Sequence, residues 1–504
     1  MRYITFLLCI LTLVSCKDKE PVKEYLGVVT IEVSGKQKAL PHFEKGLLLL
    51  HSFEYEDARE AFKLAQEIDP QMPMAYWGEA MTYNHSLWSE QNYDDGIKAL
   101  GNLETIDLSQ NATELERDFI EATYILYERN KEKPDRDKAY SEFMKGLTQK
   151  YPTNHEVAAF YAISLLGVAP QDRDESRYEA GANIAKRIIQ ENPDHPGALH
   201  YLIHSYDDPE HASLALDAAN MYAKVAPDAS HALHMPSHIY AALGMWDEVI
   251  SSNINSYGAS VNRKERKKLD NDALGYHAYH WLAYGYLQKE NPDEAKKMVL
   301  KMTQFATEKP SKRARVHNVF LKGTYLVETN DWLGEIGDII VDVSDLNISI
   351  RSQYHFLDGM IAYHKGDRSG LDLVIRKMAQ DEDRSNFVLT NGAAKLCANV
   401  TRDEVSKRDI LESQIRQFQL KGLAATLDEN VELAEEFFLK SIELESSISY
   451  SFGPPFIQKP TLELYADWLV GQENNETAIM YYKKCLENRP MRLLSLRGIE
   501  QANL

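Results

Sequence analysis

The chain has 504 residues and a formal net charge of −20 at pH 7. Its apolar fraction of 44% is ordinary for a globular protein, so the composition does not indicate disorder. The acidic balance argues against nucleic acid and anionic lipid headgroups as main partners, because like charges repel. It favours a metal ion or another cationic ligand.

The chain begins with an apolar run from Ile4 to Val14 that follows Arg2. This run is shorter than the roughly 20 residues that a membrane-spanning helix needs, and it fits a secretory leader. It ends in Leu13-Val14-Ser15-Cys16, which resembles the lipobox of bacterial lipoproteins. The resemblance implies a signal peptide over residues 1–15 and acylation of Cys16. The protein would then be held at the bacterial cell envelope, on the periplasmic or cell-surface side, through its lipid alone. The alternative is an ordinary secretory leader with a chance cysteine.

Residues 16–38 are expected to form the lipidated cysteine and a polar tether, which opens with Lys17-Asp18-Lys19-Glu20. Only Cys397 and Cys485 then remain as thiols in the mature body. They can form at most one disulfide, so the chain is no disulfide scaffold. We expect both to be small buried apolar side chains.

Apolar residues recur at helical spacing through the rest of the chain, and no long alternating strand pattern is present. A helix–turn–helix unit of about 34 residues that ends in proline is typical of tetratricopeptide (TPR) repeats. Pro193 and Pro227 are separated by this repeat length. The sequence therefore predicts an all-α fold, a TPR-type helical-repeat superhelix or α-solenoid, over residues 39–504. Weaker helix pairs are predicted at Ala112–Leu147, His155–Gln190, Ser311–Ile340, Ser349–Met378 and Arg408–Glu445.

Four blocks carry a resemblance to a bacterial TPR family of secreted or anchored proteins. They are MAYWGEAMTYNHSLW, HYLIHSYDDPEHA, HALHMPSHIYAALGMWDEVI and GPPFIQKP. The resemblance extends from about Pro41 to about Pro490, and the family has no assigned reaction. It implies that positions 2, 5, 9, 12 and 13 of each unit's first helix line a concave groove. Analogy with other TPR proteins favours a scaffold that binds a protein, a peptide or a small ligand there.

Two histidine pairs keep the phase of the repeat. His200 and His204 are four positions apart, and His234 and His238 repeat the pair one repeat length later. Residues four apart lie one above the other on a helix, and equivalent helices of adjacent repeats run side by side about 10 Å apart. Four imidazoles on one wall would suit zinc, copper or nickel. We therefore predict a candidate metal site formed by these four histidines.

Other residues modify this prediction. Asp207 and Asp208 are placed to orient ring N–H groups or to ligate directly. Pro236 lies between the second pair and would break the four-residue geometry if a helix began there. Four further histidines lie nearby but out of phase with the pairs: His211, His231, His277 and His280. Histidines copied with a repeat can also be purely structural.

The first repeats hold further candidates for the groove. His51 and His85 are also one repeat length apart, and both fall at position 13, while Trp77 falls at position 5. Ordinary helix packing is the alternative explanation for Trp77.

No motif of a known catalytic class is readable, including H-E-x-x-H, G-x-S-x-G, a phosphate-binding glycine loop and C-x-x-C. The leading hypothesis is therefore an envelope-anchored, non-enzymatic scaffold with a protein or peptide partner. The alternative is a metal-dependent protein, with zinc or copper bound by the two histidine pairs and with a role in storage, delivery or catalysis.

Overall fold

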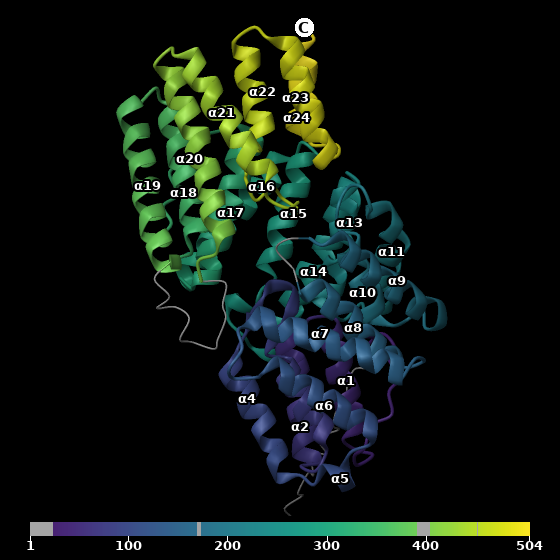
Figure 1. The fold of residues 1–504 in the computed structure, drawn as a ribbon. Helices are drawn as coiled ribbons and strands as arrows, with labels where there is room; N and C mark the ends of the chain where they lie inside the picture. Colours follow the sequence, from purple (N-terminus) through teal and green to yellow (C-terminus); the bar gives the residue numbers. More distant parts are fainter. Residues whose placement is uncertain (1–23, 169–172, 391–403, 451) are drawn as a thin grey trace, which may run out of the picture.

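The computed structural model describes residues 24–168, 173–390, 404–450 and 452–504 (Figure 1). The helices of the first half are α1 (Leu40–His51), α2 (Tyr55–Ile68), α3 (Pro73–Met81), α4 (Tyr93–Gly101), α5 (Leu108–Asn111), α6 (Glu114–Leu126), α7 (Lys133–Lys150), α8 (His155–Gly167), α9 (Glu175–Glu191), α10 (Pro196–Ser205), α11 (Leu216–Val225), α12 (Ser230–His234), α13 (Pro236–Ala242) and α14 (Trp246–Lys267). Two short antiparallel strands, β1 (Asn84–His85) and β2 (Glu90–Gln91), lie between α3 and α4.

The second half continues with α15 (Tyr276–Gln288), α16 (Pro292–Glu308), α17 (Lys312–Thr329), α18 (Ile348–His364), α19 (Arg368–Thr390), α20 (Lys407–Leu427), α21 (Val431–Ser446), α22 (Thr461–Gly471), α23 (Asn475–Asn488) and α24 (Leu493–Ala502). Successive helices pack as antiparallel pairs, and each pair stacks on the next (Figure 1). The predicted all-α helical-repeat fold is confirmed.

Small residues let these helices approach closely. Phe62 of α2 is fully buried between Gly46 of α1 and Gly78 of α3. A Cβ atom at Gly78 would lie 2.3 Å from the Phe62 ring, and one at Gly46 would lie 2.7 Å from it. Glycine at both positions therefore gives the ring the space that it fills, as ridge-into-groove helix packing requires.

The array has two large hydrophobic cores. One runs from Leu26 to Ala242, and the other runs from Leu274 to Tyr482. A small cluster that contains Val249 and Trp281 lies where the two halves meet. In Figure 1, α10, α13 and α15 lie near this junction, between the purple-to-blue half and the green-to-yellow half.

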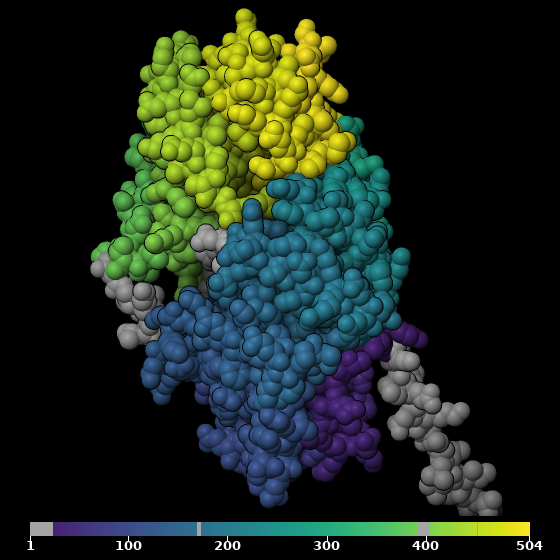
Figure 2. All heavy atoms as spheres, turned by 45° about the vertical axis from the view of Figure 1, so that its right-hand side comes forward, coloured from purple at the N-terminus to yellow at the C-terminus, as the bar shows by residue number. Residues whose placement is uncertain are grey.

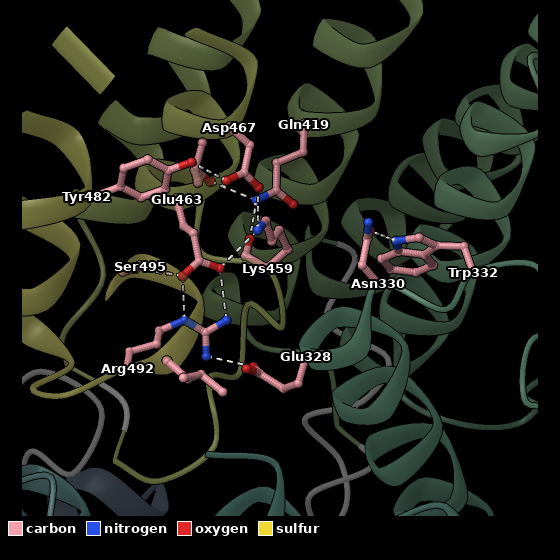
Figure 3. A network of polar contacts seen from close by, with 12 residues as sticks. Glu328, Asn330, Trp332, Gln419, Lys459, Glu463, Asp467, Tyr482, Arg492 and Ser495 are labelled. Atoms are coloured by element: carbon pink, nitrogen blue, oxygen red, sulfur yellow. Dashed lines mark hydrogen bonds and ion pairs between the residues drawn. The ribbon is translucent and has the colours of Figure 1, made fainter. Parts of the chain in front are cut away.

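A buried ionic network ties the C-terminal helices to the middle of the chain (Figure 3). Arg492, at the start of α24, donates through Nε and Nη2 to Glu463 of α22, at 2.7 and 3.0 Å. Its Nη1 donates to Glu328 of α17 at 2.6 Å and to the Tyr284 hydroxyl of α15 at 3.1 Å. Lys459 also donates to Glu463, at 3.0 Å. The network therefore joins helices that are distant in the sequence.

The part of the predicted tether that the structure describes, residues 24–38, does not extend freely from the body. Leu26 is buried, and the Val28 backbone N–H donates to the Asp194 carbonyl at 2.9 Å. The Ser34 hydroxyl donates to Glu116 at 2.8 Å. Figure 2 shows the purple N-terminal residues against the blue helices. Residues 24–38 therefore pack on the folded body, because their apolar and polar groups contact the helices.

Two other predictions have clear outcomes. Within the predicted pair Ser311–Ile340, only α17 is helical, and the rest forms turns whose Gly337 and Ile339 carbonyls accept hydrogen bonds from Lys322. Cys485 is buried, as predicted, whereas Cys16 and Cys397 lie outside the described residues. Across the described ranges, none of the helices combines the length and the apolar character needed to cross a bilayer.

Candidate metal centre

Six histidines meet on the first helices of three successive repeats. His200 and His204 lie on α10, His231 and His234 on α12, His238 on α13, and His277 on α15. They form two groups, in each of which one ligand atom per residue lies within 4.8 Å of the others. We call His200, His204 and His231 the first histidine set. We call His234, His238 and His277 the second histidine set.

The nitrogen spacing in both sets fits a single ion. His200 Nε2 lies 3.2 Å from His231 Nε2, and His234 Nε2 lies 3.1 Å from His238 Nε2. Metal–nitrogen bonds of about 2.0 Å in a tetrahedral site place two ligand nitrogens about 3.3 Å apart. Both pairs therefore have the separation of two imidazoles on one metal.

Pro236 does not destroy the second pair. Met235, between α12 and α13, has helical dihedral angles of φ −53° and ψ −36°. Its N–H donates to the His231 carbonyl, and the His238 N–H donates to the Met235 carbonyl. The chain therefore keeps helical dihedral angles between the two helices, and Pro236 occupies the first position of α13, where its missing N–H costs no hydrogen bond. His234 and His238 keep their four-residue relation.

Hydrogen bonds fix the tautomers of the second set. The Nδ2 of Asn253 donates to the Val249 carbonyl at 2.8 Å, so its Oδ1 faces His234 Nδ1 at 2.6 Å and accepts from it. His238 Nδ1 donates to the Asp207 carboxylate at 2.5 Å. With Nδ1 of each ring engaged in this way, Nε2 is the atom that both rings present to the centre of the set. The two Nε2 atoms lie 3.1 Å apart.

The first set also has ring nitrogens that are available to a ligand. His200 Nδ1 donates to the His51 carbonyl at 2.7 Å, which leaves its Nε2 unprotonated. His204 Nε2 is buried and has no hydrogen-bond partner among the described residues. A buried nitrogen without a partner is costly, so this atom also favours a ligand at the centre of the set.

Burial keeps these rings neutral. It lowers the pKa of His234 to about 3, and the neighbouring His238 lowers that pKa further. Burial and then adjacent imidazoles hold the pKa of both His200 and His204 well below 6.5. Neutral imidazole is the form that binds metals, so these three rings are ready to bind at pH 7.

The two sets adjoin each other. The ring centroids of His204 and His238 are 5.9 Å apart, and those of His231 and His234 are 6.2 Å apart. The four histidines predicted as one site thus belong to two neighbouring sets of three.

A third cluster, His51, Glu156 and His195, is already satisfied. His195 Nδ1 accepts the Ala198 N–H at 3.1 Å, so its Nε2 donates to Glu156 at 3.1 Å. His51 Nε2 contacts the other Glu156 oxygen at 2.7 Å, and its Nδ1 contacts the Tyr201 hydroxyl at 2.9 Å. Each ring nitrogen has a protein partner. The cluster is therefore structural, and it holds the His51 carbonyl that orients His200.

Aromatic side chains surround both sets. Phe53 lies against all three rings of the first set, with centroid distances of 4.3 Å to His200, 5.7 Å to His231 and 6.0 Å to His204. Trp281 stacks on His238 of the second set at 4.5 Å. These walls restrict how the imidazoles can turn.

The predicted groove residues are not gathered on one accessible wall. Trp77 is 1% exposed and packs on Phe119 and Phe160 in the core. His51 is fully buried, whereas His85 is half-buried and pairs with Glu90. Trp77 and His51 therefore lie in the core, where the first helices pack closely, rather than on an accessible surface.

The two predicted carboxylates have different positions. Asp207 accepts from His238, which is the orienting contact that the sequence suggested. Asp208 instead binds Arg173 at 2.5 Å and His211 at 2.9 Å, and neither partner belongs to the two sets. A groove of about 920 Å³ lies elsewhere, between α11 and α14, where Asn220 and Asn255 are among the lining residues.

His231 and His277 complete the sets but were only secondary candidates in the sequence. His231 precedes His234 by three positions, which is also a helical neighbour spacing. His277 follows His234 by more than one repeat length, because α14 has 22 residues and lengthens its repeat. A period search therefore misses His277.

Comparison with known proteins agrees with this architecture. Residues 41–72 match the family model described as tetratricopeptide repeat. No curated protein matches the sequence.

Several solved structures are similar at low identity. The APC/C hetero-tetramer Cut9–Hcn1 is 11% identical with a TM-score of 0.38, over 94% of this chain and 78% of that one. Yeast Tom70 is 12% identical with a TM-score of 0.33, over 92% and 88%. The human IFIT1 dimer with m7Gppp-AAAA is 12% identical with a TM-score of 0.39, over 94% and 96%. The chain thus carries a tetratricopeptide repeat at residues 41–72 within an all-helical repeat array.

Proposed function

We propose that this protein binds two transition-metal ions, copper or zinc, one in each histidine set. The observation that carries the proposal is the pair of Nε2 atoms of His234 and His238, which face each other at 3.1 Å in a buried site while their Nδ1 atoms are held by Asn253 and Asp207. A transition-metal ion between these two nitrogens would have both as ligands, at the separation that a tetrahedral site requires.

The donor chemistry narrows the choice of ion. Each set offers three imidazoles, and imidazole suits zinc, copper, nickel and iron. Calcium and magnesium prefer oxygen ligands and are disfavoured here. Three protein ligands leave one position of a four-coordinate ion open, as in catalytic zinc sites rather than closed structural ones. The sets therefore suit delivery or catalysis better than permanent structural binding.

The first test measures metal content. Protein that begins at Lys17 and carries no histidine tag is loaded with copper or zinc, desalted and examined by elemental mass spectrometry. We expect two ions per chain. The variant His204→Ala/His231→Ala should retain one ion, and His238→Ala/His277→Ala should retain the other.

A matched control uses His42→Ala, whose partly exposed ring lies on α1 outside both sets. It should retain both ions, and circular dichroism should show that every variant is folded. The proposal fails if the variant without His204, His231, His238 and His277 binds as much metal as the wild type.

We further propose that Cys16 is acylated and holds the protein at the cell envelope. The proposal stands on the apolar run that ends in Leu13-Val14-Ser15-Cys16. Metabolic labelling with a fatty-acid analogue should mark the wild type and leave Cys16→Ser unlabelled, with Cys485→Ser as the labelled control. Equal labelling of Cys16→Ser would exclude this anchor.

A further inference from the structure

The two histidine sets lie close enough to act together. Their nearest rings, His204 with His238 and His231 with His234, have centroids about 6 Å apart. A ligated metal lies roughly 3 Å from the centre of its imidazole. Two ions bound by these neighbouring rings would therefore lie at most about 12 Å apart, and closer where the ring nitrogens face one another.

The ligands favour copper in such a pair. All six are imidazoles, and no carboxylate belongs to either set. Asp207, which contacts the second set, is bonded to His238 Nδ1 on the side of that ring away from His234. Copper binds nitrogen sites more tightly than zinc does, and neutral ligands tolerate its monovalent state.

A rim of aromatic side chains adjoins the first set. Phe53 packs with Tyr55 at 5.4 Å and with Trp88 at 5.3 Å, and Trp88 lies 6.3 Å from His231. These three rim residues and His231 are partly exposed. The rim offers flat apolar faces next to a metal set, which suits an aromatic ligand.

The position of Phe53 is unusual within this chain. It occupies the turn between the two helices of its repeat with φ +54°, in the left-handed region. The equivalent turns of later repeats hold polar residues at similar angles, namely Glu290, Asn330, Glu429 and Glu473. A bulky residue in this conformation costs energy and persists where the fold requires its side chain. Here that side chain covers the first histidine set.

From this placement we propose that the two sets hold a pair of copper ions that bind dioxygen between them and oxidise a catechol-type aromatic compound at the rim. The inference rests on the proposed metal binding. Copper is one of the metals that proteins use for dioxygen chemistry.

The reaction balances as follows. Each catechol loses two electrons and two protons from its O–H bonds and becomes an ortho-quinone. Dioxygen accepts four electrons and four protons, its O–O bond breaks, and two water molecules form. Two catechols are therefore consumed for each dioxygen, and the copper ions alternate between the monovalent and divalent states without net change.

Electron paramagnetic resonance tests the pairing independently of turnover. Protein loaded with two copper(II) ions should give a broadened or lost signal, because neighbouring spins couple. The variant His238→Ala/His277→Ala, with one copper ion, should give the full signal of an isolated ion. Two isolated signals in the wild type would overturn the inference.

Turnover is tested with catechol itself as the probe, by quinone absorbance and dioxygen uptake. We expect a ratio of two catechols to one dioxygen, and no turnover above that of free copper in the one-copper variant. Trp88→Ala should raise KM roughly three- to tenfold while copper content is unchanged, and Trp88→Phe should restore most of the loss.

The outcomes separate the two proposals. If the protein binds neither copper nor zinc, the proposed metal binding and the proposed catechol oxidation are both refuted. Two bound copper ions without catechol oxidation overturn this inference and leave the proposed metal binding intact.

Discussion

Replacing Arg492 with methionine is expected to destabilise the protein by about 3–5 kcal/mol, because it leaves buried carboxylates without their cation. The guanidinium is fully buried and contacts Glu463 and Glu328, whose side chains are 0% and 2% exposed. Lys459 would still pair with Glu463, whereas Glu328 would keep only the amide of Gln288. Urea denaturation monitored by circular dichroism measures the change.

Two further variants identify the cause. Arg497 lies on α24 and forms an exposed ion pair with Glu290. Arg497→Met breaks this pair and should lower the free energy of unfolding by less than about 1 kcal/mol. The double variant Arg492→Met/Glu328→Gln should recover part of the lost stability, because it removes one unpaired charge. A loss below about 1 kcal/mol for Arg492→Met alone, as small as that of an exposed pair, would refute the structural role of the network.

The metal-free protein is expected to lose stability steeply below pH 6.5, and His280 provides the clearest single contribution. Burial lowers the pKa of His280 to about 3 in the folded protein. At pH 7.5 the ring is neutral in both states and contributes nothing. As the pH falls below 6.5, the unfolded chain takes up a proton that the folded protein excludes. Stability then falls by about 1.4 kcal/mol per pH unit, or about 2 kcal/mol between pH 6.5 and pH 5.

His280→Gln removes this titration and retains a polar group that can reach the Thr324 hydroxyl, which lies 2.8 Å from His280 Nε2. In urea denaturation at pH 6.5 and pH 5, the variant should lose about 2 kcal/mol less than the wild type between the two conditions. His42→Gln, on a partly exposed site, should follow the wild-type curve. An equal loss of unfolding free energy between pH 6.5 and pH 5 in His280→Gln and the wild type would contradict the assignment of this pH dependence to His280.

The fold could be predicted because residue spacing within short segments of the sequence determines it. The spacing of Pro193 and Pro227 by one repeat length marks the helix pairs, and small residues such as Gly46 and Gly78 mark where they touch. Each repeat contacts mainly its neighbours, so local patterns suffice to predict the array. The irregular segment after α17 was not predicted, since its carbonyls are satisfied by Lys322 rather than by a second helix.

The candidate site was predicted in part. Because His200 and His234 share a repeat position, as do His204 and His238, the sequence alone indicated one wall of imidazoles. It did not indicate that His231 and His277 would divide this wall into two sets. That division depends on the length of α14, which shifts His277 out of phase.

The sequence by itself determined the helical-repeat architecture and the in-phase histidine pairs, because both follow from residue spacing along single helices. Only the tertiary structure decided which nitrogens are free. Asn253 and Asp207 accept hydrogen bonds from Nδ1 of His234 and His238, and the His51 carbonyl accepts one from Nδ1 of His200. The His51–Glu156–His195 cluster satisfies itself. These contacts join residues up to 149 positions apart, and no local pattern encodes them. The readiness of a histidine to bind a metal depends on what its other nitrogen touches, and packing between repeats sets that partner.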